Sequence, residues 1–153
     1  MKKLLTFIIT IFILFELTTP YSLHAAEVNT ETIYMDNGDY IETTIVTYPQ
    51  TRSSNTKTAT KTSTYKNSSN EALWSVSVTA TFSYETGKSC LCTSVSGESK
   101  SYSSVWKVSG TSTSKSGNAA TAKATGTKYF IGIPMNSYNL SVTLTCDTYG
   151  NLS

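Results

Sequence analysis

The sequence is poor in the side chains that most enzymes use for catalysis. It has a single histidine, His24, among 153 residues. Histidine is the usual general base near neutral pH and the commonest metal ligand. Its scarcity argues against a Ser-His-Asp or Cys-His catalytic site and against a histidine-based zinc site. We therefore predict a non-catalytic protein that has no catalytic residues, no metal site and no cofactor.

Charge is scarce as well. Only 14% of the residues are charged, and the formal net charge is +2. A nucleic-acid-binding domain normally carries a strong basic field, so we expect no nucleic-acid partner. Among the carboxylates, Glu71 and Glu85 flank one predicted strand, but both lie near turns, where solvated acids are ordinary. A glycosidase would need two carboxylates that face each other across a cleft, and this pair is a weak candidate.

Hydroxyl side chains are abundant, with 23 Ser and 27 Thr. Such a composition can belong to a disordered chain. Here, however, β-branched and aromatic residues are also plentiful, so wholesale disorder is not expected. The hydroxyls are better explained as the solvated faces of β-strands.

The N-terminus has the pattern of a secretory signal peptide. Lys2 and Lys3 precede an apolar run over residues 4–15, and Ala25 and Ala26 supply the small residues that signal peptidase requires. The run is shorter than the ~20 residues that span a bilayer. We predict a signal peptide over residues 1–26, cleaved after Ala25 or Ala26, and no stable transmembrane segment in the mature chain. The mature protein, residues 27–153, is expected to be a single secreted, extracellular domain.

Alternation of apolar and hydroxyl residues dominates the mature chain. It is clearest over residues 74–84, where Trp74 and every second residue to Tyr84 are apolar and those between are Ser or Thr. This period of two is typical of a half-buried strand. The same pattern, more weakly, covers residues 138–146 and residues 102–108.

Turn signals separate these runs. Asn37-Gly38 predicts a type I′ hairpin with positive φ at both positions, and Gly117-Asn118 predicts a second hairpin. Further breaks are expected at Ser96-Gly97 and Pro134-Met135-Asn136. We predict about eight strands, near residues 31–36, 39–48, 56–66, 72–85, 89–96, 101–113, 119–131 and 137–147. The fold class is all-β, an antiparallel β-sandwich of immunoglobulin-like shape.

Residues 51–64 are nearly all Thr, Ser, Lys and Ala, and predict an edge strand or a linker. We favour an edge strand, because Thr is β-prone and lysines discourage edge-to-edge pairing. Residues 27–50 carry acids without Lys or Arg, whereas residues 51–70 carry basic residues without acids. We expect neighbouring strands to pair these charges; a basic strip that meets an anionic wall polymer is the alternative.

Three cysteines in an exported chain favour one disulfide and one remaining thiol. Cys90 and Cys92 lie too close on one strand to bond without strain. Cys146 continues an apolar strand face and is expected to be one partner. We favour Cys92 as the other, with Cys90 as the alternative.

Several segments together resemble a known family. They are Lys61–Tyr65, Asn67-Ser68-Ser69, Leu73–Val76, Phe82-Ser83-Tyr84, Cys92-Thr93-Ser94, Trp106, Ser114–Asn118, Leu144-Thr145-Cys146 and Gly150–Ser153. Over most of residues 31–153 the chain resembles a family of small secreted proteins of unknown function from Clostridium-like Gram-positive bacteria. The resemblance matches the family's cysteines to Cys92 and Cys146, whereas Cys90 has no counterpart in the family's pattern. It implies that the protein is secreted, but it implies no reaction.

The expected function is therefore binding or cell-surface association. One alternative is a carbohydrate- or cell-wall-binding module that stacks sugars on tyrosines near strand ends. These tyrosines are Tyr34, Tyr40, Tyr48, Tyr65, Tyr129 and Tyr149. The other alternative is a bacteriocin-like or pore-forming protein, because residues 74–84 alternate over the ~9 to 11 positions that a transmembrane β-strand needs.

Overall fold

The predicted alternation becomes eight strands in the computed structural model, which describes residues 27–49 and 55–153. The predicted signal peptide and its cleavage site lie outside the described residues. The strands are β1 (Glu27–Tyr34), β2 (Tyr40–Thr47), β3 (Thr56–Lys66), β4 (Ala72–Glu85), β5 (Ser89–Ser101), β6 (Trp106–Ser116), β7 (Ala119–Phe130) and β8 (Ile133–Thr145). The described residues contain no helix, so the predicted all-β class is confirmed.

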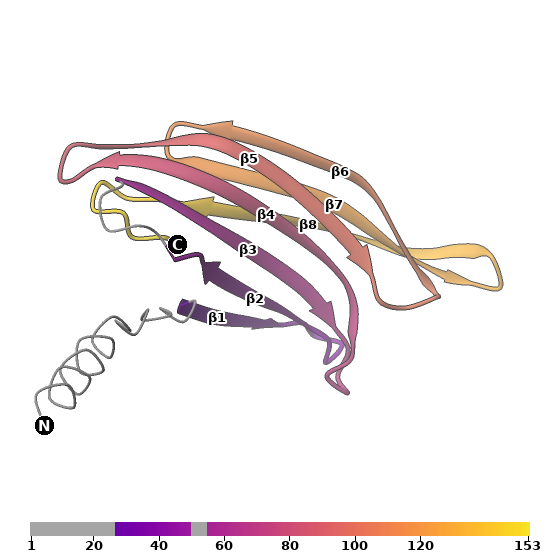
Figure 1. Ribbon diagram of the computed structural model, residues 1–153. Helices are drawn as coiled ribbons and strands as arrows, with labels where there is room; N and C mark the ends of the chain where they lie inside the picture. The colour runs from indigo at the N-terminus through magenta and orange to yellow at the C-terminus, as the bar shows by residue number, and fades with distance from the viewer. Residues whose placement is uncertain (1–26, 50–54) are drawn as a thin grey trace, which may run out of the picture.

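The strands form two antiparallel sheets whose order follows the chain. One sheet has the order β1-β2-β3-β4-β5 and the other β6-β7-β8 (Figure 1). The three-stranded sheet lies against β3, β4 and β5, which gives a β-sandwich. Immunoglobulin domains connect their strands in a Greek key, whereas both sheets here are simple meanders.

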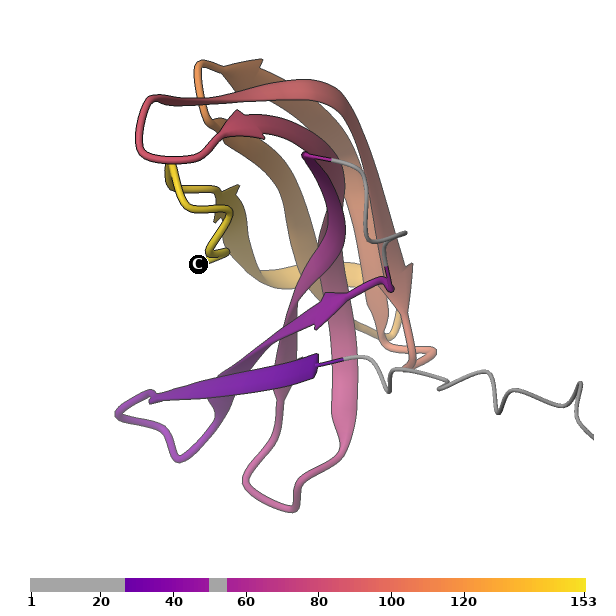
Figure 2. The ribbon, with the colours of Figure 1, turned by 60° about the vertical axis from the view of Figure 1, so that its left-hand side comes forward.

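The first two strands, β1 and β2, extend beyond the part of the five-stranded sheet that the three-stranded sheet covers. Within the described residues, the backbones of β1 and β2 do not approach the three-stranded sheet as closely as those of β3, β4 and β5 do, although Ile41 and Ile45 of β2 pack against the core. Figure 2 shows both strands swinging away from it. Their inner face is therefore covered only in part, and Ile33 on β1 is 56% exposed.

The core lies between the two sheets and uses the face that the alternation predicts. Trp74, Val76, Val78, Ala80 and Phe82 of β4 are buried. They pack against Leu140, Val142 and Leu144 of β8 and against Cys146, which follows β8. Three buried alanines of β7 belong to the same core. Four rings close one end of this core, with centroids 5.3 to 6.4 Å apart: Tyr65, Trp74, Trp106 and Tyr138.

Two glycines allow the sheets to approach closely. A Cβ at Gly126 of β7 would lie 2.2 Å from Cε2 of Trp74, so the indole rests directly on the strand backbone. A Cβ at Gly97 of β5 would lie 2.4 Å from Cγ2 of Thr113. The break that we predicted at Ser96-Gly97 is therefore wrong, because this glycine serves packing and β5 continues to Ser101.

Of the segment predicted as an edge strand or linker, residues 51–54 lie outside the described residues, and residues 56–64 belong to the interior strand β3. β3 lies between β2 and β4 and pairs with both along its length. Its threonines pair with hydroxyls of β4: the Oγ1 atoms of Thr60 and Thr79 lie 2.6 Å apart, and those of Thr58 and Thr81 2.9 Å apart. Such cross-strand pairs stabilise neighbouring strands inside a sheet. The many threonines of β3 are therefore compatible with an interior position.

The segregated charges meet across β2 and β3, as we predicted for neighbouring strands. Lys66 Nζ lies 2.7 Å from a carboxylate oxygen of Glu42. The hairpin predicted at Asn37-Gly38 is also present, since Tyr34 pairs with Tyr40. Its loop spans residues 35–39, however, and of the two predicted positions only Gly38 has a positive φ.

Candidate functional site

The end of the β7–β8 hairpin is the most unusual surface feature of the described chain. β7 and β8 pair up to Phe130 and Ile133, so Ile131 and Gly132 form the turn. Both have positive φ, 49° and 76°, as in a type I′ turn. The break that we predicted at Pro134-Met135-Asn136 is wrong. Pro134 lies within β8, an edge strand of its sheet, where a missing N–H is tolerated.

We call residues 129–135 the tip. Its side chains are apolar and exposed to water: Phe130 is 65% exposed, Ile131 85%, Ile133 62% and Met135 60%. The β5–β6 turn lies beside the base of the tip, where the Tyr129 N–H donates to the Val105 carbonyl over 2.7 Å (Figure 1). Tyr102 and Val105, which both lie in that turn, are also exposed. Six large hydrophobic side chains therefore gather at one end.

Lysines accompany the tip. The ammonium of Lys107 lies over the ring of Tyr129, 4.7 Å from its centroid. Lys128 precedes the tip and is exposed. No Asp or Glu occurs between Glu98 and Asp147 in the sequence. Sequence analysis missed this site, although Tyr129–Ile133 interrupts the apolar–hydroxyl alternation with consecutive apolar residues, a pattern that signals an exposed functional segment.

The three cysteines lie at the opposite end of the sandwich, around the β6–β7 turn. The N–H groups of Cys92 and Cys146 donate to the carbonyls of Gly117 and Asn118 over 2.8 and 3.1 Å. All three cysteines are free thiols in the structure, so the disulfide stays a prediction. The thiol of Cys146 donates to the backbone carbonyl of Asp147 over 3.4 Å.

Burial governs the ionisation of these thiols. Cys146 is fully buried, and desolvation followed by the hydrogen bond to Cys90 raises its pKa to about 12. Desolvation also raises the pKa of Cys92. The thiolate is the reactive form of cysteine, so neither residue has the environment of a catalytic nucleophile.

The carboxylates of the described residues are dispersed. Glu71 precedes β4 and Glu85 ends it. A strand rises about 3.3 Å per residue, so the two lie roughly 45 Å apart along the strand, far beyond the span of a glycosidase pair. Glu71 accepts a hydrogen bond from Asn67, and Glu85 pairs with Lys88. Across residues 27–49 and 55–153, no group of three or more His, Cys, Asp or Glu side chains could hold a metal ion.

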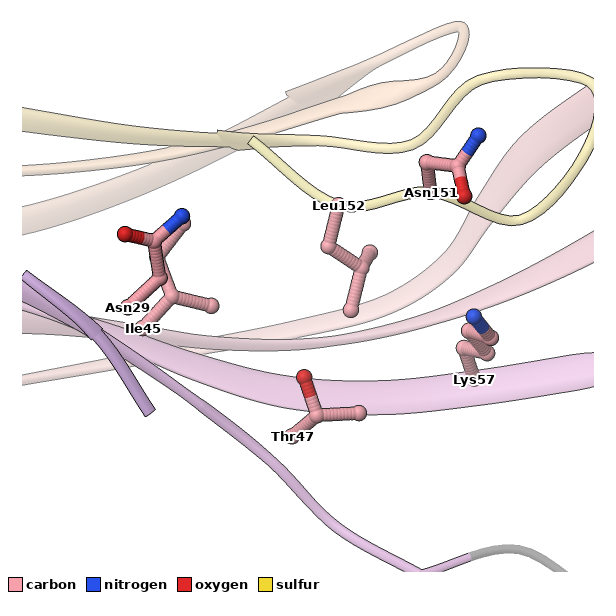
Figure 3. A pocket seen from close by; sticks show the side chains of 6 residues that line it. All are labelled: Asn29, Ile45, Thr47, Lys57, Asn151 and Leu152. Atoms are coloured by element: carbon pink, nitrogen blue, oxygen red, sulfur yellow. The ribbon is translucent and has the colours of Figure 1, made fainter. Parts of the chain in front are cut away.

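A small cleft of about 170 Å³ lies between the overhanging strands and the C-terminal segment (Figure 3). Its lining residues are Asn29, Ile45, Thr47, Lys57, Asn151 and Leu152. Asn151 is already engaged, because its Nδ2 donates to Asp147 over 2.8 Å. The cleft is therefore mostly a polar contact region between the overhanging strands and the C-terminal segment.

The tyrosines proposed as a sugar platform do not form one surface. Tyr65 is buried, and its hydroxyl donates to Asp39 over 2.6 Å. Desolvation and then this hydrogen bond raise the pKa of Tyr65. Tyr34 and Tyr40 contact each other, but their ring planes are 42° apart. The two rings do not form one flat surface, but Tyr34 is 75% exposed, so the sugar platform stays a prediction.

In comparisons with known proteins, no family model, curated protein or solved structure matches this chain. Within the described part of the chain, no helix is long and apolar enough to cross a membrane.

Proposed function

We propose that this protein is secreted and acts by associating with a cell surface, without catalysing a reaction. The observation that carries the proposal is the gathering of exposed apolar side chains at one end of the sandwich. Half of the exposed large hydrophobic residues of the described chain lie there: Tyr102, Val105, Phe130, Ile131, Ile133 and Met135. Soluble proteins rarely leave such a group in water unless it meets a partner.

The charge of the three-stranded sheet that carries the tip supports an anionic partner. Residues 99–146 contain five lysines and no acid. Four of these lysines belong to the three-stranded sheet, and all four are exposed: Lys107, Lys115, Lys123 and Lys128. A field of one sign increases the rate of encounter with an oppositely charged surface. Phosphate- and carboxylate-bearing polymers or lipids of a cell envelope fit this field.

The absence of catalysis is supported by the dispersed carboxylates and the buried, protonated thiols described above. Purified mature protein should hydrolyse none of a panel of glycans, peptides and esters. Turnover that disappears when one carboxylate is substituted would show that the protein is an enzyme.

Sedimentation tests surface association directly. The mature protein is mixed with intact bacterial cells, with isolated cell-wall sacculi and with protoplasts, and the pellets are assayed at increasing salt. We expect retention by at least one preparation, weakening as salt screens the lysines. Protein that stays in the supernatant with all three preparations at low salt would refute the proposal.

A further inference from the structure

We infer that the tip inserts into the surface of a lipid bilayer that carries anionic headgroups. The inference rests on the proposed surface association and names its partner. Four observations lead to it: the backbone conformation of Ile131, the apolar character of both faces of the hairpin end, the projection of the hairpin, and the distribution of charge around it.

Ile131 occupies a position that its side chain disfavours. Its φ of 49° lies in the left-handed region, where a β-branched residue is a true outlier. Asn or Gly would occupy this turn position without strain. The isoleucine is also 85% exposed, so it gains nothing from burial within the chain. Strain that the fold does not need points to a role outside the chain.

The hairpin end is apolar on both faces. Successive side chains of a strand point to opposite faces, and Tyr129, Phe130, Ile131 and Ile133 follow one another with only Gly132 between. A flat partner, such as a protein surface or a sugar chain, would cover one face and leave the other in water. A hydrocarbon layer surrounds the end on all sides, and Ile and Met have no planar ring for stacking on a sugar.

The tip is free to reach such a layer. Figure 1 shows the β7–β8 hairpin extending beyond the ends of the neighbouring strands. The acids at this end of the sandwich are Asp36, Asp39 and Glu71 in the β1–β2 and β3–β4 loops, and Glu98 on β5, three residues before that strand ends. Both views place these loops away from the tip (Figures 1 and 2).

Lysines lie at the base of the tip, at the level where lipid headgroups would lie if the tip entered the bilayer. Lys128 precedes the tip, and Lys107 is held at its base by the ring of Tyr129. Aromatic rings such as that of Tyr129 favour the membrane interface, and anionic lipids attract basic residues near the surface. Apolar anchoring and basic attraction together are the two contributions that hold peripheral proteins on membranes.

Vesicle binding tests the inference with the mature protein. Vesicles of phosphatidylcholine mixed with phosphatidylglycerol are compared with vesicles of phosphatidylcholine alone, by sedimentation. We expect binding to the mixed vesicles, about tenfold weaker for Ile131→Asn because one large side chain no longer enters the bilayer. Leu91→Asn, which alters an exposed leucine of β5 away from the tip, should bind as the unaltered protein does.

Two further variants separate insertion from attraction. Phe130→Trp places an indole at the tip, and its fluorescence should shift to the blue and be quenched by brominated lipid chains. Lys107→Gln with Lys128→Gln should weaken binding to the mixed vesicles by roughly 25-fold, since each lysine contributes about fivefold, and should reduce its dependence on salt.

The outcomes distinguish the two proposals. Retention on sacculi without binding to either kind of vesicle would overturn the lipid inference and leave surface association intact. Equal vesicle binding by Ile131→Asn and the unaltered protein would also overturn the inference. Because Ile131→Asn relieves strain, its loss of binding could not be attributed to misfolding, and circular dichroism would confirm the fold.

Discussion

Replacing Gly126 by alanine tests the closest contact between the two sheets. The new Cβ would lie 2.2 Å from Cε2 and 2.6 Å from Cδ2 and Cζ2 of Trp74. Ordinary carbon contacts are about 3.5 to 4.0 Å, so the ring or the strand must move by more than about 1 Å. Trp74 is fully buried and its ring lies beside those of Tyr65 and Trp106, so it has little space to rotate.

We expect Gly126→Ala to lower the free energy of unfolding by about 3 kcal/mol, at the upper end of ordinary overpacking. For a domain of this size the melting temperature should fall by roughly 10 °C. Thermal and urea unfolding followed by circular dichroism measure the change. Gly117→Ala is the matched control. No atom lies within 4 Å of its Cβ, and only the φ of 55° opposes alanine. It should cost about 1 kcal/mol.

A double-mutant cycle shows whether the indole causes the loss. Trp74→Leu alone should destabilise by leaving a cavity, partly offset because the indole Nε1 has no hydrogen-bond partner among the described residues. In the Trp74→Leu background, Gly126→Ala should cost almost nothing, giving a coupling energy of about 2 to 3 kcal/mol. If Gly126→Ala is as stable as the unaltered protein, or equally destabilising in both backgrounds, the described contact is wrong.

Four further predictions concern the tip, the C-terminal turn, the cysteines and membranes. Ile131→Asn should raise the free energy of unfolding by about 1 kcal/mol by removing left-handed strain, as measured by urea unfolding; a loss of stability would contradict the φ of this residue. Hydrogen bonds from the N–H and side chain of Asn151 lower the pKa of Asp147 in the folded protein. The stability that this carboxylate contributes is therefore present above the pKa of Asp in the unfolded chain, about 3.9, and is lost as the pH falls through the lower pKa of the folded state. The amide signal of Asn151 in NMR spectra should titrate with a midpoint below that unfolded value, and a midpoint above it would be inconsistent with these bonds. Mass mapping of the exported protein without reductant should find Cys146 in a disulfide, with Cys92 as the favoured partner and Cys90 as the alternative; a free Cys146 would refute the bond. Dye-filled anionic vesicles should stay sealed, because the apolar face of β4 is occupied by the core; rapid release would support the pore-forming alternative.

The alternation in the sequence predicted the strands well because burial of one face depends on local pattern alone. The apolar face of β4 is buried as predicted, and the observed bounds of β3 and β4 equal the predicted ones. The position of β3 inside its sheet could not be predicted in this way. Pairing partners depend on the order of the strands in space, and a row of threonines is compatible with an edge as well as with an interior.

The errors at Gly97 and at the tip have different physical causes. Glycine usually marks a turn, but Gly97 is required by Thr113 of the opposite sheet, a contact distant in sequence. The turn at Ile131 was missed because isoleucine disfavours positive φ, so local preference pointed to Pro134 instead. The tip was therefore divided between the end of the strand predicted over residues 119–131 and the break that follows it, and its exposure became evident only once the hairpin was placed beyond the sheets.

The sequential strand order has a consequence for how the chain reaches its fold. Each strand pairs with the one that precedes it, except across the β5–β6 connection between the sheets. Hairpins can therefore form one after another, with little loop entropy lost at each step. Within the described residues, the contacts of β6, β7 and β8 with strands of the first sheet bring distant parts of the chain together. A chain with this order should fold faster than a Greek-key sandwich of equal length, and its slow step should be the closing of the second sheet over the first.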